Sequence, residues 1–166
     1  MRRLEPIINR MSGKAWKVFF KANAANSYWA VPIFEEYMYK TGFYTALGQY
    51  CYKRIGQGLT GAPSTYSRLK DLATGTIPAP NSEPSLSHHP RVAFEFFLDD
   101  DQGAAESIEE MLDFLHNSYF PRLAWAGLTL NPKKTRFMTG SMQILGHQCT
   151  QSGLRPSANK VEAIRT

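Results

Sequence analysis

Cysteine and long apolar runs are scarce in this chain of 166 residues. The two cysteines, Cys51 and Cys149, lie far apart and form no C-x-x-C pair. We therefore expect both to be small core residues of a protein kept in a reducing intracellular setting, the cytoplasm or the nucleus. No apolar run is long enough to span a bilayer, and Met1-Arg2-Arg3 is not followed by the apolar stretch of a signal peptide. A soluble protein without a membrane partner is expected.

A large excess of charge of either sign is also missing. The 19 lysines and arginines outnumber the 14 acidic residues, which gives a net charge of +5. This mild excess permits a polyanionic partner but does not demonstrate one. The chain is rich instead in aromatic residues, with 10 Phe, 8 Tyr and 3 Trp, and its apolar fraction is 43%. These residues suffice for a packed core, so we expect a single domain over residues 1–166.

Hydrophobic spacing predicts separate helices and strands, which is typical of an α+β protein. The Pro- and Ser-rich segment 76–91 is predicted to be a loop, and its His88 and His89 are expected to bind no metal, because no acid or cysteine stands at ligand spacing. The strands around Ala46-Leu47-Gly48 are expected to form a hairpin. Helices are predicted over 4–11, 63–75, 108–115 and from Ser157 onward, and strands over 15–20, 28–33, 39–45, 49–55, 91–100, 127–138 and 141–150.

Three consecutive aspartates follow the strand-like segment "FEFFL". Alternation places Asp99 and Asp100 on opposite faces of an extended strand, but a hairpin turn here would bring both carboxylates to the strand tip. Two carboxylates open to water suit a hard divalent cation. The alternative is an acidic surface turn, and from Asp99, Asp100 and Asp101 alone this alternative is favoured.

Further segments accompany the box "FLDD" in a fixed order: "NSYWAVPI", "YKTGF", "QGLTGAPSTYSRL", "LTLNPKKTRF", "ILGH" and "GLRPSANKVEAIR". With them the chain resembles the reverse transcriptase domain of gypsy-type LTR retroelements, particularly fungal ones, over nearly its whole length. The resemblance implies an α+β palm, an antiparallel sheet with helices packed on one face, together with the end of the fingers. The early fingers, the thumb and the ribonuclease H region would lie outside residues 1–166.

The resemblance also implies a site for two Mg²⁺ or Mn²⁺ ions held by three carboxylates. Asp99 would bridge both ions, and Asp100 would support the ion at the primer end. The third carboxylate is expected just before the tyrosine-tryptophan pair, but this position is Asn23. An asparagine offers a neutral oxygen in place of a charge, so metal affinity and transition-state stabilisation should both fall. Asp101 belongs to the same turn and cannot take the role of the other strand.

Several positions match nucleotide-binding residues of the family. The resemblance places Tyr28 under the incoming sugar, where its ring would collide with a ribose 2′-hydroxyl and favour deoxynucleotides. Without the family, Tyr28 would be interpreted as a core tyrosine, and "GLTGAP" as a turn before a helix. The full set implied to bind nucleotide is Asn26, Ser27, Tyr28 and Gln57.

A second matched segment, "ILGH", corresponds to the hairpin that grips the primer end. Its implied members are Leu145, Gly146 and His147, and the alternative is a β-hairpin strand with a surface histidine. Lys133 and Lys134 could contact a phosphate backbone, although such a pair is more often a solvated turn.

Three interpretations of function follow. The first is a reverse transcriptase fragment of a retrotransposon polyprotein, catalytically impaired by Asn23, with RNA/DNA template-primer and deoxynucleotide triphosphates as partners. The second is a domesticated or decayed retroelement protein that binds nucleic acid or protein. The third is a structural module without a nucleic-acid role. The sequence leaves the oligomeric state open.

Overall fold

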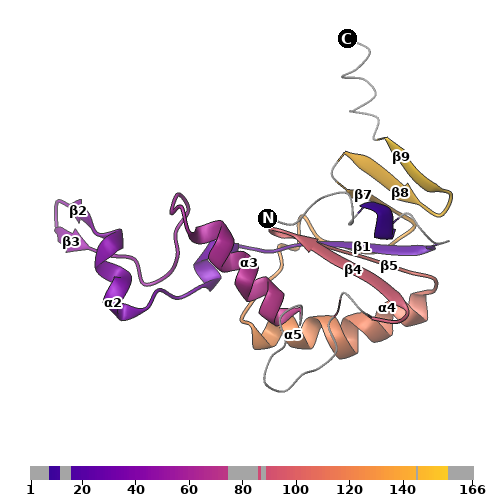
Figure 1. Cartoon of the computed structure of the whole chain (residues 1–166), viewed down its shortest axis with the longest axis horizontal. Coiled ribbons are helices and arrows are strands. Elements are labelled where there is room, and N and C mark those ends of the chain that lie inside the picture. The colour runs from indigo at the N-terminus through magenta and orange to yellow at the C-terminus, as the bar shows by residue number, and fades with distance from the viewer. Residues whose placement is uncertain (1–7, 12–15, 75–85, 87–88, 145, 157–166) are drawn as a thin grey trace, which may run out of the picture.

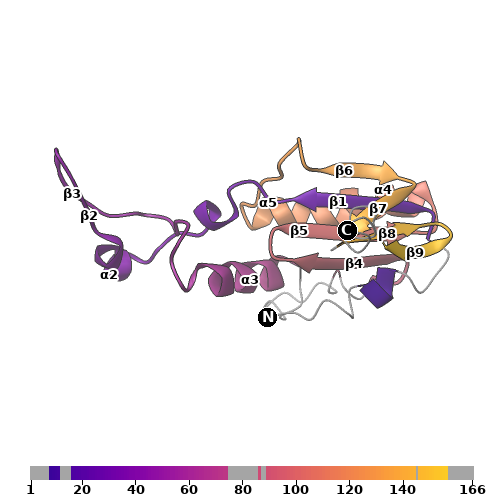
Figure 2. The ribbon, with the colours of Figure 1, turned by 90° about the horizontal axis from the view of Figure 1, so that it is seen from above.

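A four-stranded antiparallel sheet forms the centre of the molecule. The structure is a computed structural model that describes residues 8–11, 16–74, 86, 89–144 and 146–156. The sheet order is β4-β5-β1-β6, so the first strand of the chain lies between two later ones (Figure 2). The strands are β1 (Val18–Asn23), β4 (Val92–Phe97), β5 (Asp100–Ala105) and β6 (Arg136–Thr139).

Helices cover one face of this sheet (Figure 1). Ser107 begins the first of the later helices, where its side chain accepts a hydrogen bond from the Glu110 backbone N–H. Between the helices and the sheet lies an aromatic core in which Phe20 contacts the rings of Phe94, Phe114 and Tyr119. The helices of this layer are α3 (Ala62–Ala73), α4 (Ile108–Phe114), the π-helical segment η4 (Leu115–Tyr119) and α5 (Phe120–Trp125).

A small second sheet covers part of the opposite face. It consists of β7 (Ser141–Ile144), β8 (His147–Thr150) and β9 (Gly153–Pro156), paired in that order. Its buried side chains pack against residues of the main sheet that point away from the helices, such as Phe19. The part of this face nearest the end of β1 lies outside this buried apolar cluster.

An arm projects from the sheet and its helices (Figure 1). Many of its large apolar side chains are exposed, including Phe34 at 78% and Tyr44 at 82%. Its elements are the 3-10 helix η1 (Ser27–Ala30), α2 (Glu35–Met38), the 3-10 helix η2 (Tyr39–Thr41), β2 (Phe43–Thr45) and β3 (Gly48–Tyr50).

Strand alternation explains why the two faces of the sheet differ. On β5, Asp101, Gly103 and Ala105 share the helix-facing parity, whereas Asp100 and Gln102 point the other way. Gly103 lies directly under an aromatic ring, since a Cβ at this position would lie 2.1 Å from Phe20 Cε1. Any larger residue would therefore displace the central aromatic side chain of the core.

The α+β class and the helices on one face of an antiparallel sheet are confirmed. The hairpin around Ala46-Leu47-Gly48 is also found, with strands shorter than expected. The helix from Ser157 and most of the loop 76–91 lie outside the described residues. No helix within the described part of the chain is long and apolar enough to cross a membrane.

Local predictions were wrong at several positions, and the strand expected over 127–138 is found only from Arg136 onward. Residues 28–33 do not form a strand, because the left-handed Asn26 (φ 50°) turns the chain into η1, where Val31 N–H bonds the Tyr28 carbonyl. Residues 141–150 form two strands of a hairpin, since a turn at Gly146 (φ 81°) reverses the chain. Cys51 is exposed in the arm, whereas Cys149 is buried as expected.

Candidate functional site

The three aspartates lie at a tight β4–β5 hairpin. Leu98 adopts a left-handed conformation (φ 50°) at the turn, and the Ala24 N–H donates to the Asp99 carbonyl at 2.8 Å. This bond ties the turn to the end of β1. Asp99 Oδ1 is buried and has no hydrogen-bond partner among the described residues. The predicted hairpin turn thus exists, and it brings Asp99 next to the strand that carries Asn23.

Asn23 and Asp100 face each other across the β1–β5 pair. Their Cα atoms are register partners, and Asn23 Nδ2 donates to Asp100 Oδ1 at 2.9 Å. The asparagine therefore presents its amide N–H to the carboxylate. A carboxylate at position 23 would instead place a second negative charge against Asp100.

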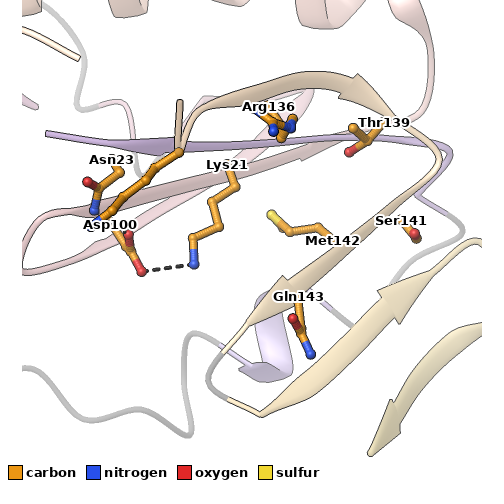
Figure 3. Close-up of a pocket in the computed structure, with 9 residues that line it drawn as sticks. Lys21, Asn23, Asp100, Arg136, Thr139, Ser141, Met142 and Gln143 are labelled. Carbon is orange, nitrogen blue, oxygen red and sulfur yellow. Dashed lines mark hydrogen bonds and ion pairs between the residues drawn. The ribbon is translucent and has the colours of Figure 1, made fainter. Parts of the chain in front are cut away.

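Lys21 completes this cluster and was not predicted from the sequence. Its Nζ lies 2.9 Å from Asp100 Oδ2, and the two side chains are 33% and 32% exposed. Lys21 and Asn23 share a face of β1 because they are two residues apart in a strand. The two-residue spacing could have placed Lys21 beside Asn23 if the sequence analysis had predicted a strand that reaches Asn23. Figure 3 shows both side chains directed toward Asp100.

A cavity of about 540 Å³ opens beside the cluster. It lies between the polar end of the main sheet and β7, where Met142 and Gln143 line it (Figure 3). Three basic residues and one acidic residue contribute to its wall: Lys21, Lys134, Arg136 and Asp100. The cavity therefore carries a local excess of positive charge.

The residues of this cluster do not fit a divalent metal site. Both oxygens of Asp100 accept from the cationic or amide nitrogens of Lys21 and Asn23. Hard divalent ions prefer carboxylate and carbonyl oxygens, and the described part of the chain holds no group of three His, Cys, Asp or Glu side chains suited to a metal. The roles given to Asp99 and Asp100 as metal ligands, and to Asn23 as a catalytic position, remain predictions.

Asp101 points to the opposite face and forms a buried ion pair. It pairs with the ammonium group of Lys70 on α3, and Tyr119 donates its hydroxyl to Asp101 Oδ2 at 2.7 Å. Asp101 and Lys70 are both almost fully buried. Burial, followed by the nearby Asp101 charge, raises the pKa of Tyr119 well above its usual value. Asp101 therefore lies on the face of the sheet opposite to Asn23 and Asp100, and its carboxylate is taken up by Lys70 and Tyr119.

Lys70 was also missed by the sequence analysis. The buried residues of α3 are Ala62, Tyr66, Lys70 and Ala73, and this spacing puts the lysine on the helix face that meets the sheet. A lysine in the apolar stripe of a helix signals a buried partner, because an unpaired ammonium ion would be costly there.

The predicted nucleotide-binding residues lie on two chain segments beyond the end of β1. Asn26 and Ser27 lead into η1, and Ser27 is buried. The Tyr28 ring is half-buried, 5.9 Å from the ring of Tyr66 in a T-shaped contact. Gln57 is exposed in the segment before α3. Their role in nucleotide binding remains a prediction.

The segment that the resemblance matches to a primer-grip hairpin forms the β7–β8 turn, and its role in gripping a primer remains a prediction. Gly146 occupies this turn, and His147 begins β8 with its Nδ1 buried and without a partner among the described residues. Leu145 lies outside the described residues. Lys133 and Lys134 are exposed in the turn before β6, as expected for either a phosphate contact or a solvated turn.

His89 is the described member of the histidine pair, since His88 lies outside the described residues. Its ring contacts Phe114 at 5.1 Å between ring centroids. Burial, followed by the charge of Arg91, lowers the pKa of His89 below its usual 6.5. The expectation that these histidines bind no metal stays a prediction.

Comparison with known proteins places these features in a family. The model of the family "Reverse transcriptase (RNA-dependent DNA polymerase)" matches residues 5–149. The chain is 31% identical over 161 residues to the retrovirus-related Pol polyprotein from transposon 297 of Drosophila melanogaster, covering 96% of this chain and 14% of that protein. It is 30% identical over 125 residues to the corresponding polyprotein from transposon 412 of the same organism, covering 75% and 9%. The chain thus spans only a small part of the curated relatives it matches.

Solved structures share the fold. A foamy viral protease-reverse transcriptase in complex with double-stranded DNA superposes with a TM-score of 0.79 and 20% identity, covering 100% of this chain and 26% of that one. The same kind of enzyme in complex with an RNA/DNA hybrid gives a TM-score of 0.75 with 20% identity, covering 99% of this chain and 20% of that one. With its sheet, its aspartate hairpin and its matched sequence, the chain belongs to the reverse transcriptase (RNA-dependent DNA polymerase) family.

Proposed function

We propose that the chain is the palm and part of the fingers of a reverse transcriptase from a gypsy-type, fungal-like LTR retroelement, with impaired nucleotide transfer. The observation that carries the impairment is the Asn23–Asp100 contact, in which an amide N–H occupies the place of a carboxylate oxygen. Polymerases of this family use Mg²⁺. A neutral residue at position 23 removes one of the charges on which hard-ion affinity and transition-state stabilisation depend.

Primer extension tests the impairment. The purified chain is incubated with an RNA template, a DNA primer and deoxynucleotide triphosphates in Mg²⁺ and, separately, in Mn²⁺. We expect no appreciable extension in Mg²⁺ and at most weak extension in Mn²⁺, which tolerates less regular ligation. An Asp100→Ala variant purified in the same way controls for contaminating polymerase. The proposed impairment would be rejected if the unmodified chain extends the primer over many nucleotides and the Asp100→Ala variant does not.

Binding of an RNA–DNA duplex is the second part of the proposal. The cavity beside β1 and β6 supports it, because its wall carries Lys21, Lys134 and Arg136 against a single acidic residue. The structural relatives named above were solved with an RNA/DNA hybrid and with double-stranded DNA. Lysines that neutralise phosphates release counterions, so such binding weakens with added salt.

Fluorescence anisotropy with a labelled RNA–DNA hybrid over a salt series tests this part. We expect the affinity to fall steadily with salt, and the double variant Lys133→Gln/Lys134→Gln to reduce the slope by about 2. Arg68→Gln, an exposed change on α3 in the helix layer, is the matched control and should leave the slope unchanged. Binding that is absent or insensitive to salt would favour a module without a nucleic-acid role.

The second candidate function is a decayed or domesticated retroelement protein that binds nucleic acid without synthesis. The basic cavity next to a neutralised Asp100 favours it. Salt-dependent duplex binding together with absent extension in both metals supports this candidate, whereas extension in Mn²⁺ supports a weakened polymerase.

A further inference from the structure

Asp100 forms an ion pair with a lysine of the same chain, Lys21. Lys21 Nζ contacts one of its oxygens at 2.9 Å, while Asn23 Nδ2 contacts the other at 2.9 Å. We propose that Lys21 is the internal counter-ion of Asp100 and takes the position of a divalent cation, so that a metal ion binds only by displacing this ammonium group. The inference rests on the site of the proposed function but does not require that polymerase activity survives.

The strand register explains why a lysine can fill this position. Lys21 is the partner of Gln102, and Asn23 is the partner of Asp100, so Lys21 and Asp100 are diagonal neighbours across the strands. Such neighbours are separated by roughly 7–8 Å between Cα atoms, which only a long side chain can bridge. The lysine stem covers this distance along the sheet surface and delivers its ammonium group to Oδ2.

The charge around the cavity acts in the same direction. A dication that approaches Asp100 meets the positive charge of Lys21 at contact distance and, more weakly because solvent screens them, the charges of the exposed Lys134 and Arg136 on the same wall. Asp99 and Asp100 supply two negative charges, and Lys21 already offsets one of them. An incoming ion must therefore compete for the same oxygen and also overcome like-charge repulsion.

Asn23 makes this arrangement self-consistent. Its amide N–H can donate to Asp100, whereas a carboxylate at this position would repel it. In Asn23→Asp, Lys21 would lie between two acids and pair with both. This change alone should therefore restore less metal affinity than the same change combined with removal of the lysine charge.

Mn²⁺ binding to the purified chain tests the proposal. Binding is measured by electron paramagnetic resonance of the free ion and by thermal unfolding with and without metal. The key variant is Lys21→Met, which keeps a long unbranched side chain and removes its positive charge. We expect its Mn²⁺ affinity to exceed that of the natural sequence by roughly tenfold, a factor that corresponds to about 1.4 kcal/mol. Asn23→Asp should give a smaller gain, and Lys21→Met/Asn23→Asp the largest.

Matched variants separate displacement of Lys21 from a general change of charge. Lys134→Met removes a positive charge from the same cavity without touching Asp100, and we expect it to change Mn²⁺ affinity by less than about twofold, as for a solvent-screened charge. Lys21→Arg keeps the charge and should bind Mn²⁺ as weakly as the natural sequence. Lys21→Met/Asp100→Asn should lose the gain, because the oxygen that the metal would take is no longer charged.

The outcomes are distinct. Equal gains in Lys21→Met and Lys134→Met would reduce the effect to general charge and overturn the proposal, as would unchanged Mn²⁺ affinity in a folded Lys21→Met. Tight Mn²⁺ binding by the natural sequence would also overturn it. None of these measurements depends on primer extension, so a failure here is separable from a failure of the proposed polymerase function.

Discussion

Two neighbouring aspartates of β5 have opposite environments. Asp100 lies on the open face, about one-third exposed, with Lys21 and Asn23 as partners. Asp101 is fully buried on the helix face, with Lys70 and Tyr119 as partners. Both aspartates are ion-paired, but only the pair of Asp100 can exchange its cation with solvent. Because successive residues of a strand point to opposite faces, Asp100 has a partner that a dissolved ion can replace, whereas the partner of Asp101 is enclosed in the core.

The difference predicts how each pair contributes to folding. A buried pair that loses one partner leaves an uncompensated charge in the protein interior, which is strongly destabilising. An exposed pair gains little, because water solvates both groups and salt screens them. The two sites can therefore be compared by removing the lysine from each.

The largest effect is expected from Lys70→Met. It leaves Asp101 buried without its cation, so the free energy of unfolding should fall by about 3–5 kcal/mol. Urea denaturation measures this loss. The double variant Lys70→Met/Asp101→Asn should recover most of it, because it removes the unpaired charge and keeps a side-chain oxygen that accepts from the Tyr119 hydroxyl. A double variant as unstable as the single one would show that the buried charge is not the cause.

Gly103→Ala tests the same buried face by volume. The added Cβ would lie within 2.1 Å of the Phe20 ring, so overpacking should lower the free energy of unfolding by about 1–3 kcal/mol. Gly140→Ala is the matched control, because a Cβ there meets nothing within 4 Å. Urea denaturation of both variants compares them, and an equal loss would contradict the tight contact at Gly103.

Lys21→Met should have a much smaller effect on the metal-free fold. Its ion pair with Asp100 is partly solvated, so the loss should be at most about 1 kcal/mol and should shrink as salt is added. Denaturation at low and high ionic strength measures both quantities. A loss as large as that of Lys70→Met would remove the contrast between the two faces.

The smallest effect concerns His89, which borders the helix layer. Burial lowers its folded-state pKa below the ordinary 6.5, with Arg91 acting in the same direction and Asp113 and Glu110 opposing it. The unfolded chain therefore takes up the proton more readily, and stability should fall as the pH drops through 6.5 toward the folded pKa. We expect a lower melting temperature at pH 5.5 than at pH 7.5, and a smaller pH difference in His89→Asn. An unchanged difference would assign the effect to other groups.

Local patterns predicted the elements with strong periodicity. The helices over 63–75 and 108–115 and the strand before the aspartates were found close to their expected bounds. The apolar alternation of Trp29, Val31 and Ile33 gave a wrong prediction, because the left-handed backbone of Asn26 turns the chain into a 3-10 helix at Ser27–Ala30. Hydrophobic spacing over 141–150 predicted a single strand, although the matched segment "ILGH" implied a hairpin, and the chain reverses at Gly146 (φ 81°).

The sequence by itself determined the family and predicted the aspartate hairpin, since both depend on residue types in a fixed order. Only the tertiary structure decided which cation each aspartate receives. Lys21 and Lys70 are separated from their partners by 79 and 31 positions, so no local pattern pairs them. The strand register brings Lys21 to Asp100, and the packing of α3 on the opposite face brings Lys70 to Asp101. Ion pairs depend on distance in space and not on distance along the chain, and the sheet determines which face each aspartate side chain points to.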